Sequence, residues 1–240
     1  MKLHVALFFG GLFGALATLF ILLSFGTDYW LLATETCEPH GVYKKDETVV
    51  SNQDHQNITF YHEGFFWRCS FEDKMSKDDD LWNFWFGNLA HAKVCNLAFL
   101  LPFPIPDQTY NSTSYQSAII YRGFWSVSML VGVVAVVAGG FIIICAAPFT
   151  SHCLYKAGGG LYLISGFFFL VVTVMYVIWL DALDVMALYY DYQTTHKCPY
   201  FTLDMSYGLS FMFAPVGVFF CLLAGILFLA IGRAIQKSYT

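Results

Sequence analysis

Long apolar stretches alternate with polar segments along the 240 residues of this chain. Asp, Glu, Lys and Arg are all missing from four stretches, over residues 5–26, 124–151, 161–180 and 209–232. Each stretch reaches the length of about 20 residues that a helix needs to cross the hydrocarbon core of a bilayer. A buried helix of a soluble protein would be shorter and would carry a polar face. The pattern therefore predicts four transmembrane helices, over residues 5–26, 124–147, 158–180 and 209–232.

The first apolar stretch differs in two respects from a signal peptide. It is longer than the apolar core of about 7–15 residues that signal peptides have, and no small-x-small cleavage site follows it. The sequence Asp28-Tyr29-Trp30 that comes next is typical of an aromatic anchor at a membrane interface. We therefore expect this first helix to remain in the protein, with the lipid bilayer as the chain's surroundings.

The basic residues predict how the chain is oriented. If the N-terminus is inside, the inner segments carry Lys2, Lys156, Arg233 and Lys237 and no acidic residue. Short cytoplasmic segments are enriched in Lys and Arg. We therefore expect both termini in the cytoplasm, with a short tail over residues 233–240.

Two outer segments follow from this orientation, over residues 27–122 and 181–207. They hold all 17 acidic residues and the other eight basic ones, which gives a net charge of −9. Such a surface repels nucleic acid, so nucleic acid is excluded as its partner. It suits docking of basic or cation-dependent partners. High charge also keeps a surface soluble, and we favour that simpler interpretation.

The long outer segment is rich in aromatic and β-branched residues, as strands are. Residues 29–34, 58–71 and 94–101 are strand candidates. The segment thus predicts a small antiparallel sheet that stands on the membrane. As a whole, the sequence predicts an α-helical membrane protein of one domain, a four-transmembrane-helix bundle with a small extracellular antiparallel β-sheet.

The seven cysteines divide according to this topology. Cys37, Cys69, Cys95 and Cys198 fall outside, where disulfides form, and four cysteines permit three pairings. The others, Cys145, Cys153 and Cys221, lie at or inside the membrane and should stay reduced. Cys145 and Cys153 border the inner interface, where they are either palmitoylated or ordinary small apolar residues.

Two sequons lie in the long outer segment, at Asn57-Ile-Thr and Asn111-Ser-Thr, and predict N-glycans at Asn57 and Asn111. No spacing of Cys and His suits zinc, and no catalytic or phosphate-binding motif is present. No charged side chain lies within a predicted span, although pumps and proton-coupled transporters usually carry one there. We therefore expect neither an enzyme nor a cofactor or metal site.

The outer segment carries a motif that resembles the claudin superfamily, which includes peripheral myelin proteins and auxiliary channel subunits. Its residues are Trp30, the run Gly64-Phe65-Phe66-Trp67-Arg68-Cys69, Cys95, and Arg122 just before the second helix. The run departs from the family pattern because Phe66 stands where the family has Trp, and Trp67 follows it. The resemblance implies the predicted fold and a Cys69–Cys95 disulfide. We further expect the aromatic run to pack against Trp30.

The implied pairing leaves Cys37 and Cys198, one in each outer segment. Two remaining thiols in an oxidising compartment are expected to pair. Two alternatives stay open: Cys37 binds another chain, or Cys37 pairs within the first outer segment and Cys198 remains free.

A closer resemblance, to a muscle-enriched claudin-like branch, covers nearly the full length. Among the segments that carry it are residues 25–35, 62–69, 120–125 and 145–160. It implies a non-enzymatic regulator in the plasma membrane that associates with integrin β1 and restrains myoblast differentiation and fusion. The alternatives are a cell–cell adhesion or paracellular barrier protein and an auxiliary subunit of an ion channel. Gly10 and Gly14 suit close helix packing within the chain or lateral homo-association.

Overall fold

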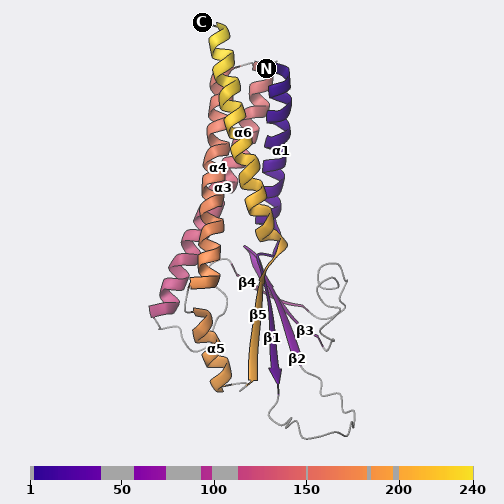
Figure 1. Ribbon diagram of the computed structural model, residues 1–240, viewed down its shortest axis with the longest axis vertical. Coiled ribbons are helices and arrows are strands. Elements are labelled where there is room, and N and C mark those ends of the chain that lie inside the picture. The colour runs from indigo at the N-terminus through magenta and orange to yellow at the C-terminus, as the bar shows by residue number, and fades with distance from the viewer. Residues whose placement is uncertain are drawn as a thin grey trace.

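The computed structural model describes residues 3–38, 57–73, 93–98, 113–149, 151–182, 185–196 and 200–239. Four long helices in this part of the chain run side by side: α1 (Leu3–Gly26), α3 (Thr113–Phe149), α4 (His152–Ala182) and α6 (Leu209–Tyr239). Each contains a stretch that is long and apolar enough to span a membrane. Both termini lie at one end of the bundle and a β-sheet lies at the other (Figure 1). The predicted fold class is confirmed.

Three of these helices extend beyond the apolar stretches of the sequence. α3 begins well before residue 124, α4 begins before residue 158, and α6 continues through the predicted tail. A helix does not have to end where the hydrocarbon ends, because its backbone hydrogen bonds also form in polar surroundings. Gly159 therefore lies inside α4, where a Cβ would meet the carbonyl oxygen of Gly225 at 2.9 Å. This glycine allows α4 and α6 to approach closely.

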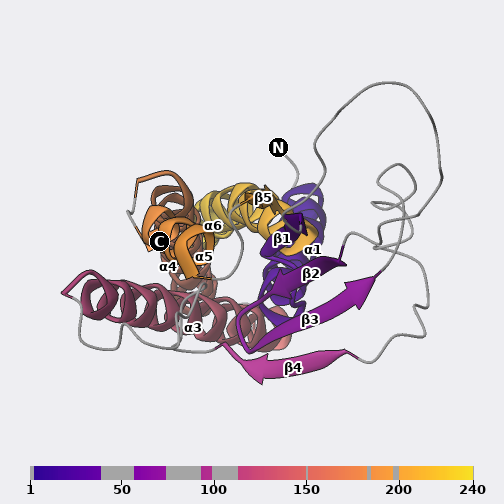
Figure 2. The same cartoon turned by 90° about the horizontal axis from the view of Figure 1, so that it is seen from below.

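The sheet has five antiparallel strands in the described residues, in the order β4-β3-β2-β1-β5. Their bounds are β1 (Leu31–Glu38), β2 (Asn57–Glu63), β3 (Trp67–Asp73), β4 (Val94–Leu97) and β5 (Tyr200–Tyr207). The strand candidate over residues 58–71 is in fact a hairpin, β2 and β3. Figure 2 shows β2, β3 and β4 side by side at the outer end of the bundle.

The second outer segment contributes two elements that the sequence did not predict. A helix, α5 (Val185–His196), is followed by β5, which pairs with β1 from Leu31↔Tyr207 to Glu38↔Tyr200. The segment is therefore part of the sheet.

One apolar core runs from the helices into the sheet. It extends from Ala6 and Ile235 near the termini to Trp30, Leu31 and Phe65 at the outer end. Gly10 and Gly14 belong to this interior, since a Cβ at either position would contact Phe228 of α6 at 3.1–3.3 Å. The two glycines thus serve packing within the chain, and lateral homo-association would need another surface.

Candidate functional site

Trp30 links the sheet to the helices. Its side chain is 0% exposed, and its indole Nε1 donates a hydrogen bond of 2.8 Å to the carbonyl oxygen of Ser24. The ring makes edge contacts with Trp125, Tyr176 and Phe211, at centroid distances of 5.3, 5.1 and 5.8 Å. These partners come from α3, α4 and α6. Trp30 therefore fixes the start of β1 against three helices at once.

The turn between β2 and β3 packs beside this tryptophan. Gly64 is required there, because a Cβ would overlap the backbone of Asp28. Its amide donates a hydrogen bond of 2.9 Å to the carbonyl oxygen of Trp67, which closes the turn. Phe65 is fully buried against Phe25 and Trp125, with ring centroids 4.9 and 5.8 Å apart.

A buried cluster of three charged side chains lies behind the turn. One oxygen of the Glu63 carboxylate accepts from the Arg68 guanidinium, with nitrogen–oxygen distances of 2.6 and 2.8 Å. The other oxygen lies 3.0 Å from the guanidinium of Arg122. Arg122 also donates to the carbonyl oxygen of Gly64 at 2.9 Å, and lies 4.2 Å from the centre of the Trp125 ring. The basic residue that precedes the second apolar stretch thus binds the turn to α3.

His62 and Asp28 lie on the outer side of the same junction. The Nδ1 atom of His62 is 2.9 Å from the carbonyl oxygen of Asp28, and the imidazole stacks on Tyr29 at 4.7 Å. Burial lowers the pKa of the His62 imidazole and raises the pKa of the Asp28 carboxyl. His62 is therefore neutral at physiological pH.

Helix α5 is attached to the sheet by a polar contact. The Tyr189 hydroxyl donates to a carboxylate oxygen of Glu35 in β1 at 2.6 Å, and it accepts from the Gln193 amide at 2.8 Å. Burial raises the pKa of the Tyr189 hydroxyl, which keeps it protonated as a donor. Phe201 of β5 packs on the same tyrosine.

Four apolar side chains remain exposed at the edge of the sheet, and we call them the outer rim: Phe66 (37% exposed), Trp67 (45%), Val94 (59%) and Leu97 (63%). Trp67 and Leu97 are direct partners across β3 and β4. Phe66 touches Phe25 in the last turn of α1, with centroids 5.1 Å apart, so the rim lies at the level of the membrane surface. Trp67 and Leu97 share one face of the sheet, whereas Val94, three residues before Leu97 on the same strand, points to the other face. Exposed apolar side chains that lie together, as Trp67 and Leu97 do, mark contact surfaces.

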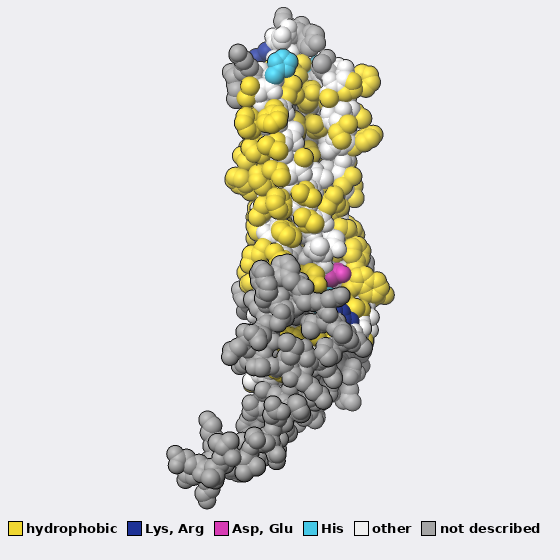
Figure 3. Space-filling view, turned by 90° about the vertical axis from the view of Figure 1, so that its right-hand side faces the viewer, with side chains coloured by type: hydrophobic (Ala, Val, Ile, Leu, Met, Phe, Trp, Pro, Cys, Tyr) yellow, Lys and Arg dark blue, Asp and Glu magenta, His cyan; other side chains and the backbone are white. Residues whose placement is uncertain are grey.

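The outer rim corrects one expectation from the sequence. Phe66 and Trp67 were expected to pack inside with Trp30, and for their exposed side chains that expectation is wrong. Of the three consecutive aromatic residues only Phe65 is fully buried. Figure 3 shows hydrophobic side chains over the visible face of the bundle, with charged ones only near its ends.

The cysteines agree with the implied pairing as far as the structure describes them. Cys69 and Cys95 form a disulfide that joins β3 to β4, with Cα atoms 4.1 Å apart. Cys37 is also disulfide-bonded, and it lies opposite Phe201 in the β1–β5 register. Cys198 lies outside the described residues, so the Cys37–Cys198 bridge stays a prediction. The predicted reduced cysteines are free thiols: Cys145, Cys153 and Cys221.

The two sequons differ in what the structure says of them. Asn57 is the first residue of β2 and lies opposite Cys37 in the strand register. Asn111 lies outside the described residues. Both N-glycans remain predictions.

Glu63, Arg68 and Tyr189 were not predicted as site residues. For the first two the signal was present, since a carboxylate and a guanidinium interrupt an aromatic stretch and a charge in such surroundings needs a partner. Among the described residues, no group of three or more His, Cys, Asp or Glu could hold a metal ion.

The family model of PMP-22, EMP, MP20 and claudin tight-junction proteins matches residues 15–230. The chain belongs to this family. It is also similar along its whole length to chains named Transmembrane protein 182. That of Danio rerio is 69% identical over 248 residues, covering 100% of both chains. That of Homo sapiens is 50% identical over 237 residues, covering 98% of this chain and 99% of the relative. This PMP-22/claudin family is one of membrane proteins and not of enzymes.

Proposed function

We propose that this chain is a regulatory protein of the plasma membrane that binds integrin β1 laterally and restrains myoblast differentiation and fusion. The full-length similarity to chains named Transmembrane protein 182 supports it, together with the muscle-enriched branch that the sequence resembles. The mechanism needs no catalysis. A regulator that binds one conformation of a receptor more tightly than another shifts the receptor towards that conformation.

The observation that carries the lateral mode of binding is the outer rim. Phe66 lies beside the outer end of α1, and Trp67 and Leu97 pair on one face of the two outermost strands, where a partner in the same membrane reaches them. The buried Glu63–Arg68–Arg122 cluster and the Cys69–Cys95 disulfide hold this edge rigid. A rigid surface loses little conformational entropy on binding.

The proposed orientation places both termini in the cytoplasm. The end of the bundle that holds the termini carries Lys156, Arg233 and Lys237, and residues 108–180 and 205–240 contain no Asp or Glu. Cytoplasmic ends are basic in this way. Epitope tags at either terminus should stain only permeabilised myoblasts, and staining of intact cells would reverse the orientation.

The partner is tested by affinity purification from detergent-solubilised myoblast membranes. Wild-type protein should retain integrin β1, whereas Trp67→Ser and Leu97→Ser should retain several-fold less at equal surface level. Ile120→Ser is the matched control, since Ile120 is 72% exposed at the outer part of α3 and lies outside the outer rim. Absence of integrin β1 from the wild-type sample would exclude this partner. Equal retention by both rim variants would exclude the rim as the contact surface.

The regulatory effect is tested by the fraction of nuclei in fused myotubes. Overexpression of wild-type protein should lower this fraction, and the rim variants should lower it less. The description of the matching family model includes claudins of the tight junction. It therefore favours cell–cell adhesion or a paracellular barrier as the second candidate function. That function predicts aggregation of suspended cells that express the protein, with no change in fusion.

A further inference from the structure

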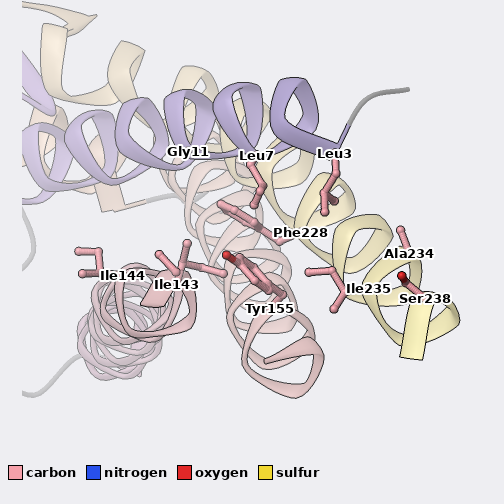
Figure 4. Close-up of a pocket in the computed structure, with 11 residues that line it drawn as sticks. Leu3, Leu7, Gly11, Ile143, Ile144, Tyr155, Phe228, Ala234, Ile235 and Ser238 are labelled. Atoms are coloured by element: carbon pink, nitrogen blue, oxygen red, sulfur yellow. The ribbon is translucent and has the colours of Figure 1, made fainter. Parts of the chain in front are cut away.

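A cavity of about 780 Å³ lies between α1 and α3 at the end of the bundle that holds the termini. Leu7 of α1, Ile143 of α3 and Phe228 of α6 form apolar walls (Figure 4). The volume falls within the range of about 300–1,000 Å³ of sites that hold a small organic ligand. α1 and α3 make the loosest contact between adjacent helices of the bundle, which leaves this space between them.

The cavity is open towards the surrounding membrane. Two residues that line the cavity are exposed: Ile144 is 72% exposed, and Leu3, near the N-terminus, is 40% exposed. Gly11 lines its inner part, and a Cβ added to Gly11 would meet nothing within 4 Å. A hydrocarbon chain from the adjacent leaflet therefore has a direct path into the space.

Two hydroxyl groups make this cavity more than an apolar gap. Tyr155 of α4 is 4% exposed, and its oxygen points into the space in Figure 4. No hydrogen bond joins this hydroxyl to another described residue, so it is available as a donor to a ligand in the cavity. Ser238 of α6 lines the same cavity near the end of the helix. The cavity thus offers hydrogen-bond donors where a lipid carries its ester and phosphate oxygens.

The charge around the cavity selects among lipids. Lys156 follows Tyr155 directly, and Arg233 and Lys237 are neighbours in sequence of the lining residues Ala234 and Ser238. α1, α3 and α6 contain no acidic residue. The only one in α4 is Asp181, at the opposite end of that helix from the cavity. Basic residues near the membrane surface attract anionic headgroups, by about fivefold in affinity for each residue.

We propose that this cavity binds one anionic phospholipid. One acyl chain lies between α1 and α3, the Tyr155 and Ser238 hydroxyls donate to the lipid's ester or phosphate oxygens, and Lys156, Arg233 and Lys237 attract the headgroup. In the proposed orientation the lipid comes from the cytoplasmic leaflet. The inference is independent of integrin β1, and its test uses purified protein alone.

The test is native mass spectrometry of the full-length protein in detergent, titrated with dioleoyl phosphatidylserine, dioleoyl phosphatidylcholine or cholesterol. Phosphatidylserine should bind about 100-fold more tightly than either of the others, because each of the three basic residues contributes about fivefold. Arg233→Gln combined with Lys237→Gln should bring it close to phosphatidylcholine. Tyr155→Phe, which removes only the hydroxyl, should weaken phosphatidylserine binding about threefold to tenfold.

A matched pair of glycine variants tests the location. Gly11→Leu places a side chain in the cavity and should abolish lipid binding. Gly160→Leu is the control, because its Cβ also has open space while Gly160 does not line the cavity. Equal affinity for phosphatidylcholine or cholesterol would overturn the anionic lipid. Wild-type affinity in both Tyr155→Phe and Gly11→Leu would overturn the site.

Discussion

The buried cluster of Glu63, Arg68 and Arg122 predicts that substitutions at Glu63 and Arg122 affect stability non-additively, and it predicts in which direction. In Glu63→Gln, the Arg68 and Arg122 guanidiniums remain in a site where their side chains are 10% and 6% exposed, with the carboxylate between them removed. Removing one partner of a buried ion pair costs about 3–5 kcal/mol. For a protein of this size, each kcal/mol lowers Tm by about 2–4 °C, so we expect a decrease of about 6–20 °C.

Adding Arg122→Gln to the Glu63→Gln protein should restore part of the stability that Glu63→Gln removes. Arg122→Gln alone breaks the 3.0 Å ion pair with Glu63 and the 2.9 Å hydrogen bond to Gly64, and is destabilising. In the Glu63→Gln protein the same change removes an uncompensated buried cation. The double variant should therefore be at least as stable as Glu63→Gln alone, with a coupling energy of about 1.5–3 kcal/mol.

The assay is thermal unfolding of the four proteins in the same detergent at pH 7.5. Asp204→Asn is the control, because it removes one negative charge from an exposed position of the same sheet and should change stability by less than about 0.5 kcal/mol. If the Tm changes of the two single variants simply add in the double variant, Glu63 and Arg122 act independently and the reasoning is refuted.

Other parts of the outer region give further predictions. Trp30→Ala removes a fully buried aromatic, should cost about 3–5 kcal/mol and should retain the protein in the endoplasmic reticulum, unlike an alanine at an exposed rim position. Folding lowers the pKa of His62, so the stability that the neutral imidazole contributes is complete above about pH 6.5 and is lost as the pH falls below that value. Tm should therefore decrease from pH 7.5 to pH 5.5 more in wild type than in His62→Gln. Enzymatic removal of N-glycans should shift the gel mobility of wild type, and Asn57→Gln and Asn111→Gln should each remove one step of that shift. Peptide mapping without reduction should recover Cys198 linked to β1, and an alkylated Cys198 would exclude that bridge.

The transmembrane part of the fold follows from the sequence because lipid imposes a length and a composition on each span. The ends of the helices do not follow in the same way. α3 begins at Thr113, among polar residues that carry no hydropathy signal, and therefore includes Arg122. The sequence placed Arg122 before a helix, whereas its function as an anchor depends on a helical position that faces Glu63.

The sheet was predictable where the sequence carries a strand signal, since the three strand candidates coincide with β1, with β2 and β3, and with β4. β2 and β3 lie in an aromatic, β-branched stretch, and the turn at Gly64 that divides them is marked by one glycine alone. β5 contains Asp204 and Ser206 and has no comparable signal. Its partner β1 is 162 or more residues away in sequence, from Glu38 to Tyr200, and no local pattern reveals a pairing of that kind.

This distant pairing explains how the outer part forms one body with the helices. β1 continues from α1, and β5 leads directly into α6, so the paired strands extend two adjacent helices beyond the membrane. Ser210 at the start of α6 reinforces the junction, since its hydroxyl donates to the carbonyl oxygen of Thr27 at 2.9 Å and accepts from the amide of Tyr29 at 3.0 Å. The outer strands are therefore joined to α1 and α6 by an unbroken series of strand pairings, from β3 through β2 to β1 and β5.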